Sequence, residues 1–88
     1  MIRTINWAKA EIERIRLDYE RYAEEAESQQ ISVLKAAGRE NLKALEERLQ
    51  EPYRIIGALT CSDNFEFEYY CTARRLIEAI DKALQPNS

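Results

Sequence analysis

The chain has 88 residues, enough for one small domain, because domains usually run from about 50 to 250 residues. It carries 13 Lys and Arg against 16 Asp and Glu, a net charge of -3, and it has no histidine. A mildly acidic chain without a basic block is a poor ligand for phosphate backbones, and the commonest general base and metal ligand is absent. Hydrophobic residues make up 45% of the chain, too many for a disordered segment, and only 2 Gly and 2 Pro favour long helices.

The compartment is predicted from what the sequence lacks. No stretch of about 18 apolar residues could span a bilayer, and the N-terminal residues lack the apolar core of a signal peptide. We therefore expect a cytoplasmic protein without a membrane partner. In that compartment Cys61 and Cys71 are expected to be free thiols, and without histidine they are too few for a zinc site.

The N-terminal part of the chain predicts a long amphipathic helix over about 4–37, which Thr4 or Asn6 can cap. Its apolar residues alternate in steps of three and four, the spacing of a coiled-coil seam or a bundle face. The seam consists of Ile5, Ala8, Ile12, Ile15, Tyr19, Tyr22 and Ala26. The other faces carry four base–acid pairs at i,i+4 spacing, namely Lys9–Glu13, Arg14–Asp18, Arg16–Glu20 and Arg21–Glu25. Because this seam is longer than so small a chain is expected to cover, it predicts a homodimer.

The helical stripe then loses its seven-residue repeat at Gln29 and continues at a period near 3.6 as far as Leu49. Gly38 either ends a helix in a left-handed cap or lies inside a continuous helix at a cost of about 1 kcal/mol. We favour a turn at Gly38. A second helix is predicted over about 40–59, bent at Pro52, because proline removes a backbone donor and restricts the residue before it.

The segment 53–71 fits two structures. The alternation of Phe65-Glu66-Phe67-Glu68-Tyr69 after a polar Ser62-Asp63-Asn64 turn is typical of a β-hairpin. Asp63 and Glu66 equally form a helix capping box, and a stripe of period 3.6 follows them. We favour a helix over 63–85, because an isolated hairpin is marginal in water, with a frayed tail at 86–88. The predicted fold class is therefore all-α: a small three-helix bundle forming a single helical domain over 1–88.

Catalysis and nucleic-acid binding are not expected. Neither cysteine has a histidine to activate it, and adjacent acids such as Glu46 and Glu47 are typical of a solvated helix surface. No phosphate-binding loop or metal-ligand spacing occurs. We therefore expect no enzyme, no cofactor and no metal. The basic doublet Arg74-Arg75 is expected to pair with Glu78, so direct nucleic-acid binding is not expected either.

Apolar and aromatic residues outside the buried stripes predict a contact surface for another protein. Residues 62–70 combine three acids with four aromatics, and no basic residue occurs between Arg54 and Arg74. The alternative is that the aromatics form second buried faces and that the acids stabilise a helix N-terminus. The candidate partner-binding residues are Trp7, Leu17, Phe65, Glu66, Phe67, Glu68, Tyr69 and Tyr70.

The leading functional interpretation is a non-enzymatic protein-binding helical module, an adaptor, chaperone or regulator that occupies a partner's surface. One alternative is a small acidic inhibitor of the phage type, anti-CRISPR-like or DNA-mimic-like, which blocks a nucleic-acid-handling machine with carboxylates placed like phosphates. Its candidate carboxylates are Glu24, Glu25, Glu27, Asp63, Glu66 and Glu68. A second alternative is a purely structural coiled-coil oligomeriser.

Overall fold

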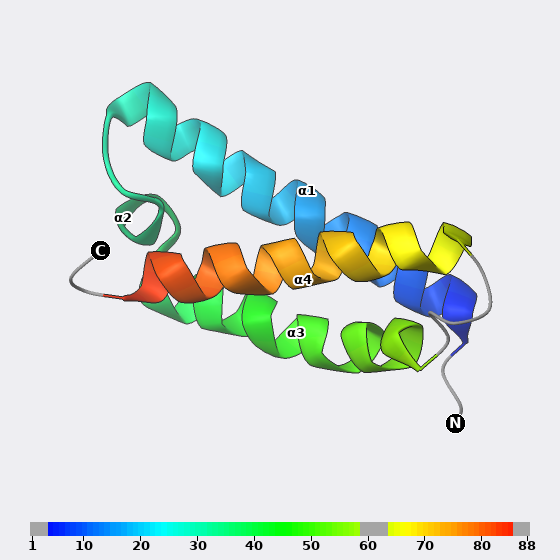
Figure 1. Cartoon of the computed structure of the whole chain (residues 1–88). Coiled ribbons are helices and arrows are strands. Elements are labelled where there is room, and N and C mark those ends of the chain that lie inside the picture. Colours follow the sequence, from blue (N-terminus) through cyan, green and yellow to red (C-terminus); the bar gives the residue numbers. More distant parts are fainter. Residues whose placement is uncertain (1–3, 59–63, 86–88) are drawn as a thin grey trace.

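The computed structural model describes residues 4–58 and 64–85, and within them the side chains of all but 64–66. These residues form four helices and no strand: α1 (Ile5–Gln29), α2 (Val33–Ala37), α3 (Arg39–Gly57) and α4 (Asn64–Leu84). The helix α3 runs antiparallel to α1 and α4, and the short α2 packs at the end where α1 turns back (Figure 1). The all-α bundle is confirmed. The β-hairpin alternative is wrong for the described part of 53–71, which is helical on both sides of its gap.

The first helix is shorter than predicted. It begins where the Thr4 hydroxyl accepts a hydrogen bond from the Trp7 backbone N–H at 3.1 Å. It ends at Gln29, because Gln30 adopts a left-handed conformation with φ of 57°, so the prediction of one helix over 4–37 is wrong beyond that point. Residues 28–32 are polar apart from Ile31 and have little apolar surface to bury, and Ser32 caps a new helix by accepting from the Lys35 N–H at 3.1 Å.

The turn predicted at Gly38 exists. Gly38 lies between α2 and α3 with φ of 88° and ψ of 145°, which confirms the turn. The side-chain amide of Asn41 donates to the Ala37 carbonyl at 2.7 Å and so satisfies one of the carbonyl groups at the end of α2. The helix predicted over about 40–59 is α3, which runs through Pro52, and this proline is fully buried in the bundle. Burial of the proline ring offsets the hydrogen bond that its missing N–H removes.

The predicted self-association seam of α1 lies in the core of the single chain. Ala8, Ile12 and Ile15 are fully buried, Ala26 is nearly so, and Tyr19 and Tyr22 pack against the same cluster. The other helices contribute Ala37, Leu42, Leu45, Leu49, Ile56, Ala73, Leu76 and Ile80 to it. The homodimer was predicted because this face was expected to be left uncovered. The chain's own α3 and α4 cover it, so that reason no longer applies and the homodimer stays a prediction.

One arginine ties α1 to α3. The Arg48 guanidinium pairs with Glu11 at 2.7 Å and with Asp18 at 3.2 Å, both on α1. Of the predicted pairs along α1, Arg16–Glu20 forms at 2.7 Å. Other pairs on this helix use i,i+3 spacing instead: Arg14–Glu11, Arg16–Glu13 and Arg21–Asp18. Acidic residues of α1 therefore form ion pairs with α3 as well as within α1, which the sequence does not indicate.

Candidate protein-binding surface

The structure separates the predicted partner-binding residues into exposed and half-buried groups. Leu17 and Phe67 are the exposed large hydrophobic side chains among those described, at 56% and 52% exposure. Trp7, Tyr69 and Tyr70 are half-buried and pack against the core, and Glu68 is exposed. The side chains of Phe65 and Glu66 lie outside the described residues.

The two exposed residues lie on separate surfaces. Lys9 lies over the Tyr69 ring, 5.6 Å from its centroid, and α1 and α4 run in the same direction (Figure 1). At that alignment Leu17 lies about ten residues farther along the bundle than Phe67, or roughly 15 Å. Helical spacing also places Leu17 opposite the buried stripe of α1, among the charged residues Glu13, Arg14, Glu20 and Arg21. Leu17 and Phe67 therefore do not form one patch.

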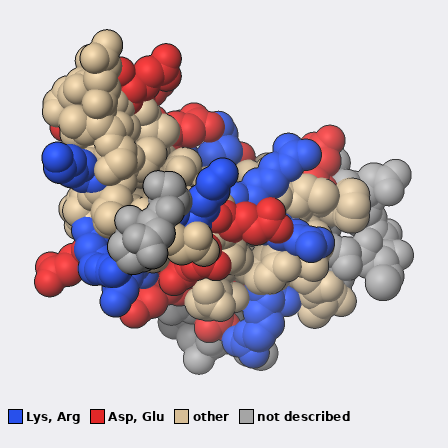
Figure 2. All heavy atoms as spheres, turned by 60° about the vertical axis from the view of Figure 1, so that its left-hand side comes forward, with Lys and Arg blue, Asp and Glu red and all other residues tan. Residues whose placement is uncertain are grey.

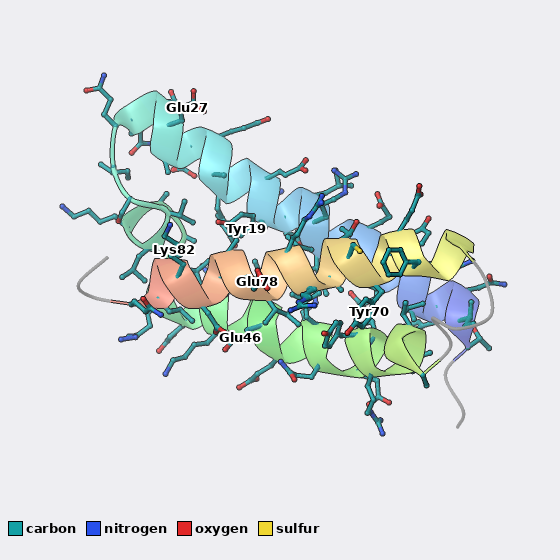
Figure 3. All side chains as sticks on the ribbon, viewed as in Figure 1. Tyr19, Glu27, Glu46, Tyr70, Glu78 and Lys82 are labelled. Atoms are coloured by element: carbon teal, nitrogen blue, oxygen red, sulfur yellow. The ribbon has the colours of Figure 1, made fainter. Side chains whose placement is uncertain are left out.

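An aromatic pair joins α3 to α4 one helical turn from Phe67. The rings of Tyr53 and Tyr70 stack with their centroids 5.0 Å apart and their planes 15° apart, and the Tyr53 hydroxyl donates to the Tyr70 hydroxyl at 3.0 Å. Tyr70 projects from α4 toward α3 (Figure 3). Together with Gln50, Glu51, Arg54 and Gly57, the two tyrosines line a cavity of about 440 Å³. We call this cavity the tyrosine groove.

Gly57 sets how closely the two helices approach in the tyrosine groove. A Cβ atom at this position would lie 3.3 Å from Cε1 of Tyr70, closer than side chains ordinarily pack. Tyr53 and Gly57 are four residues apart and so share one face of α3. The ring of Tyr70 therefore lies over the glycine backbone while it stacks on Tyr53.

Charged and polar side chains surround the two tyrosine rings at the edge of the tyrosine groove. Arg54 pairs with Glu51 at 2.7 Å at the edge of the cavity. Arg74 pairs with Glu78 at 3.3 Å as predicted, but Arg75 forms no ion pair with a described residue, so that half of the prediction is wrong. The hydrogen bond with Tyr70, and then partial burial, raise the pKa of the Tyr53 phenol above its ordinary value of 10.0. An apolar centre with a polar, solvent-accessible rim is the usual composition of a protein interface.

Sequence reasoning missed the α3 half of this site. Tyr53 and Gly57 lie in the segment whose structure was ambiguous, and their meeting with Tyr70 depends on how two helices pack. The signal in the sequence was their i,i+4 spacing, which becomes informative only once the segment is known to be helical. Among residues 4–58 and 64–85 no cluster of three metal-ligating side chains occurs. Cys71 is a half-buried free thiol, and Cys61 lies outside the described residues.

The acids proposed for an inhibitor do not gather on one described surface. Glu24, Glu25 and Glu27 are exposed near the end of α1, where Figure 3 labels Glu27. Glu68 lies near the start of α4, at the opposite end of the bundle (Figure 1). Asp63 and the Glu66 side chain lie outside the described residues. On the face shown in Figure 2, acidic and basic side chains are interspersed.

None of the described helices is both long and apolar enough to cross a bilayer. None of the protein-family models, curated proteins or solved structures compared with the chain matches it significantly. Function is therefore inferred from the side chains and their geometry.

Proposed function

We propose that this chain is a non-enzymatic protein-binding helical module that contacts its partner through the tyrosine groove and Phe67. The observation that carries the proposal is a 52% exposed phenylalanine one helical turn before Tyr70, whose ring lines a cavity of about 440 Å³. Exposed aromatic side chains beside a preformed hollow are typical centres of binding energy in protein interfaces. In this proposal a partner packs on Phe67 and places an apolar side chain in the groove.

The rim of the groove supports recognition of a protein segment. Gln50, Glu51 and Arg54 offer both donors and acceptors around the tyrosine rings. The Arg54–Glu51 pair is exposed, and surface pairs of this kind contribute at most about 1 kcal/mol, so exchanging it for contacts with a partner costs little. The complementary segment is one with a central apolar side chain flanked by polar groups.

Photo-crosslinking tests the proposal with a matched control within the chain. A photo-reactive phenylalanine analogue is placed at Phe67 in one variant and at Leu17 in another, since the two sites are similarly exposed at 52% and 56%. We expect a discrete crosslinked protein from position 67 and none from position 17, after irradiation in the source cell. Identical crosslinks from both positions, or a partner captured from position 17 alone, would contradict the proposal.

The same experiment distinguishes the other interpretations. A crosslinked product of two copies of this chain would support a structural oligomeriser instead. Capture of a nucleic-acid-handling protein, with binding that weakens steeply with salt and with Glu68→Lys, would support the acidic inhibitor. Binding through the tyrosine groove is expected to depend weakly on salt, because the contact is chiefly apolar.

A further inference from the structure

A second groove lies on the opposite side of α4, where α1, α2 and α4 meet. Two neighbouring cavities of about 330 and 280 Å³ share Tyr19 and Ala79 in their walls. The first is also lined by Arg16, Glu20, Thr72, Arg75 and Leu76, and the second by Ser32, Val33, Leu34, Lys82 and Ala83. We call the two together the Tyr19 groove. Their lining residues belong to α1, α2 and α4, and α1 diverges from α4 toward the end of the bundle where α2 lies (Figure 1).

The Tyr19 groove is apolar along its floor and long enough for a helix. Leu76 is buried, and Tyr19 extends from α1 toward α4 (Figure 3). Along α4 the lining runs from Thr72 to Ala83, a length of about 16 Å, or three helical turns. An amphipathic helix lying in such a groove contacts it through apolar residues at i, i+3, i+4 and i+7.

The rim of the Tyr19 groove is positively charged although the whole chain carries a net charge of -3. Arg75 and Lys82 are exposed there, and neither forms an ion pair with any residue that the structure describes. The Arg16 guanidinium is already held by Glu20 at 2.7 Å and by Glu13. Among the described residues these two rim cations therefore have no ion-pair partner, and they lie seven residues, or about 10 Å, apart on one face of α4.

We propose that the Tyr19 groove binds an acidic amphipathic helix of a partner protein. The apolar stripe of that helix packs on Tyr19, Leu76 and Ala79, and two carboxylates about seven residues apart pair with Arg75 and Lys82. The choice of occupant follows from charge complementarity and from the length of the groove. This site is independent of the tyrosine groove and of the function proposed for it.

The test is a selection from a displayed library of amphipathic helical peptides with randomised residues flanking a fixed leucine stripe. We expect the selected peptides to carry Asp or Glu at two flanking positions about seven residues apart. Purified peptides should bind the Arg75→Glu/Lys82→Glu variant at least about tenfold more weakly than the wild-type chain. A peptide whose two acids are replaced by lysines should recover affinity for this variant. Lys43→Glu, which reverses an exposed charge on α3 outside the groove, should change affinity by less than about twofold.

Several results would overturn the proposal. These are an absence of selected binders, a preference for neutral or basic flanking residues, or binding that survives the double charge reversal. Self-association of the chain that the same reversal abolishes would assign the groove to a second copy instead of a partner. Phe67→Ala should leave peptide binding to the Tyr19 groove unchanged. A failure of this proposal can therefore be distinguished from a failure of the function proposed for the tyrosine groove. Unchanged thermal unfolding of the reversed variant shows that lost binding is not lost folding.

Discussion

We expect an acid pair between α3 and α4 to make the stability of the bundle depend on pH. Glu46 on α3, labelled in Figure 3, lies beside Asp81 on α4. The hydrogen bond with Asp81, followed by partial burial and the charge of Asp81, raises the pKa of Glu46 from its ordinary 4.5 to about 7. Lys43 opposes this shift of the pKa, and Glu47 adds to it.

The sign of the effect follows from the two pKa values. Between pH 4.5 and about 7 the folded chain binds a proton at Glu46 that the unfolded chain has released. The stabilisation is therefore complete below pH 4.5 and is lost as the pH rises through about 7. The shift corresponds to about 3 kcal/mol without screening. Because Asp81 is exposed and Glu46 only partly buried, solvent screening reduces our expectation to about 1 kcal/mol.

Urea unfolding between pH 5 and pH 8 measures this directly. The chain has no histidine, so no imidazole titrates in that range. We expect the free energy of unfolding of the wild-type chain to fall by about 1 kcal/mol as the pH rises, because Glu46 ionises beside Asp81. Glu46→Gln keeps a donor toward Asp81 at every pH, so it should remove this dependence and be the more stable protein at pH 8. The control Glu47→Gln removes the same charge one residue later and should retain most of the dependence, because Glu47 is the smallest contributor to the raised pKa of Glu46. A wild-type stability that is constant over this range, or an equal slope in Glu46→Gln, would refute the reasoning.

Three further substitutions test the turns and the link between α1 and α3 by urea unfolding. Gly38→Ala should destabilise the chain by about 1–3 kcal/mol, since φ of 88° with ψ of 145° suits only glycine, and a neutral result would contradict that backbone conformation. Gln30→Gly should stabilise it by about 1 kcal/mol by relieving a left-handed residue, whereas destabilisation would argue against the chain ending α1 there. Arg48→Ala should cost about 1 kcal/mol through its lost pairs with Glu11 and Asp18, and a cost unchanged by high salt would rule out these pairs as its source.

The helices could be predicted because their causes are local. The apolar period of α1 and α4 and the glycine at Gly38 identify helix faces and a turn from neighbouring residues alone. The end of α1 at Gln29 coincides with the point where the seven-residue repeat fails, but a pattern of apolar residues does not show whether a polar turn stays helical. The packing of α3 and α4 on the apolar stripe of α1 is a tertiary contact, which a pattern of neighbouring residues does not reveal. From the sequence alone the stripe therefore resembled an exposed self-association seam.

In the candidate site, too, the features with local causes could be predicted and those that depend on helix packing could not. Phe67 could be predicted as an exposed residue because it falls outside the apolar stripe of its own helix. Trp7 also falls outside the stripe of α1, yet it is half-buried, because the buried face of a bundle helix is wider than a coiled-coil seam. The stack of Tyr53 on Tyr70 could not be predicted, since it joins residues 17 positions apart through the packing of two helices.

Binding through the tyrosine groove is tested most directly by the affinity of three purified chains for the partner that is crosslinked at position 67. We expect Phe67→Ala to weaken binding by about 30-fold, equivalent to about 2 kcal/mol, as for a central aromatic contact. Leu17→Ala removes a similarly exposed side chain from another surface and should change the affinity by less than about twofold. Both variants should unfold at the wild-type temperature, because neither side chain is buried. An unchanged affinity for Phe67→Ala, or equal losses for the two variants, would contradict the proposed function.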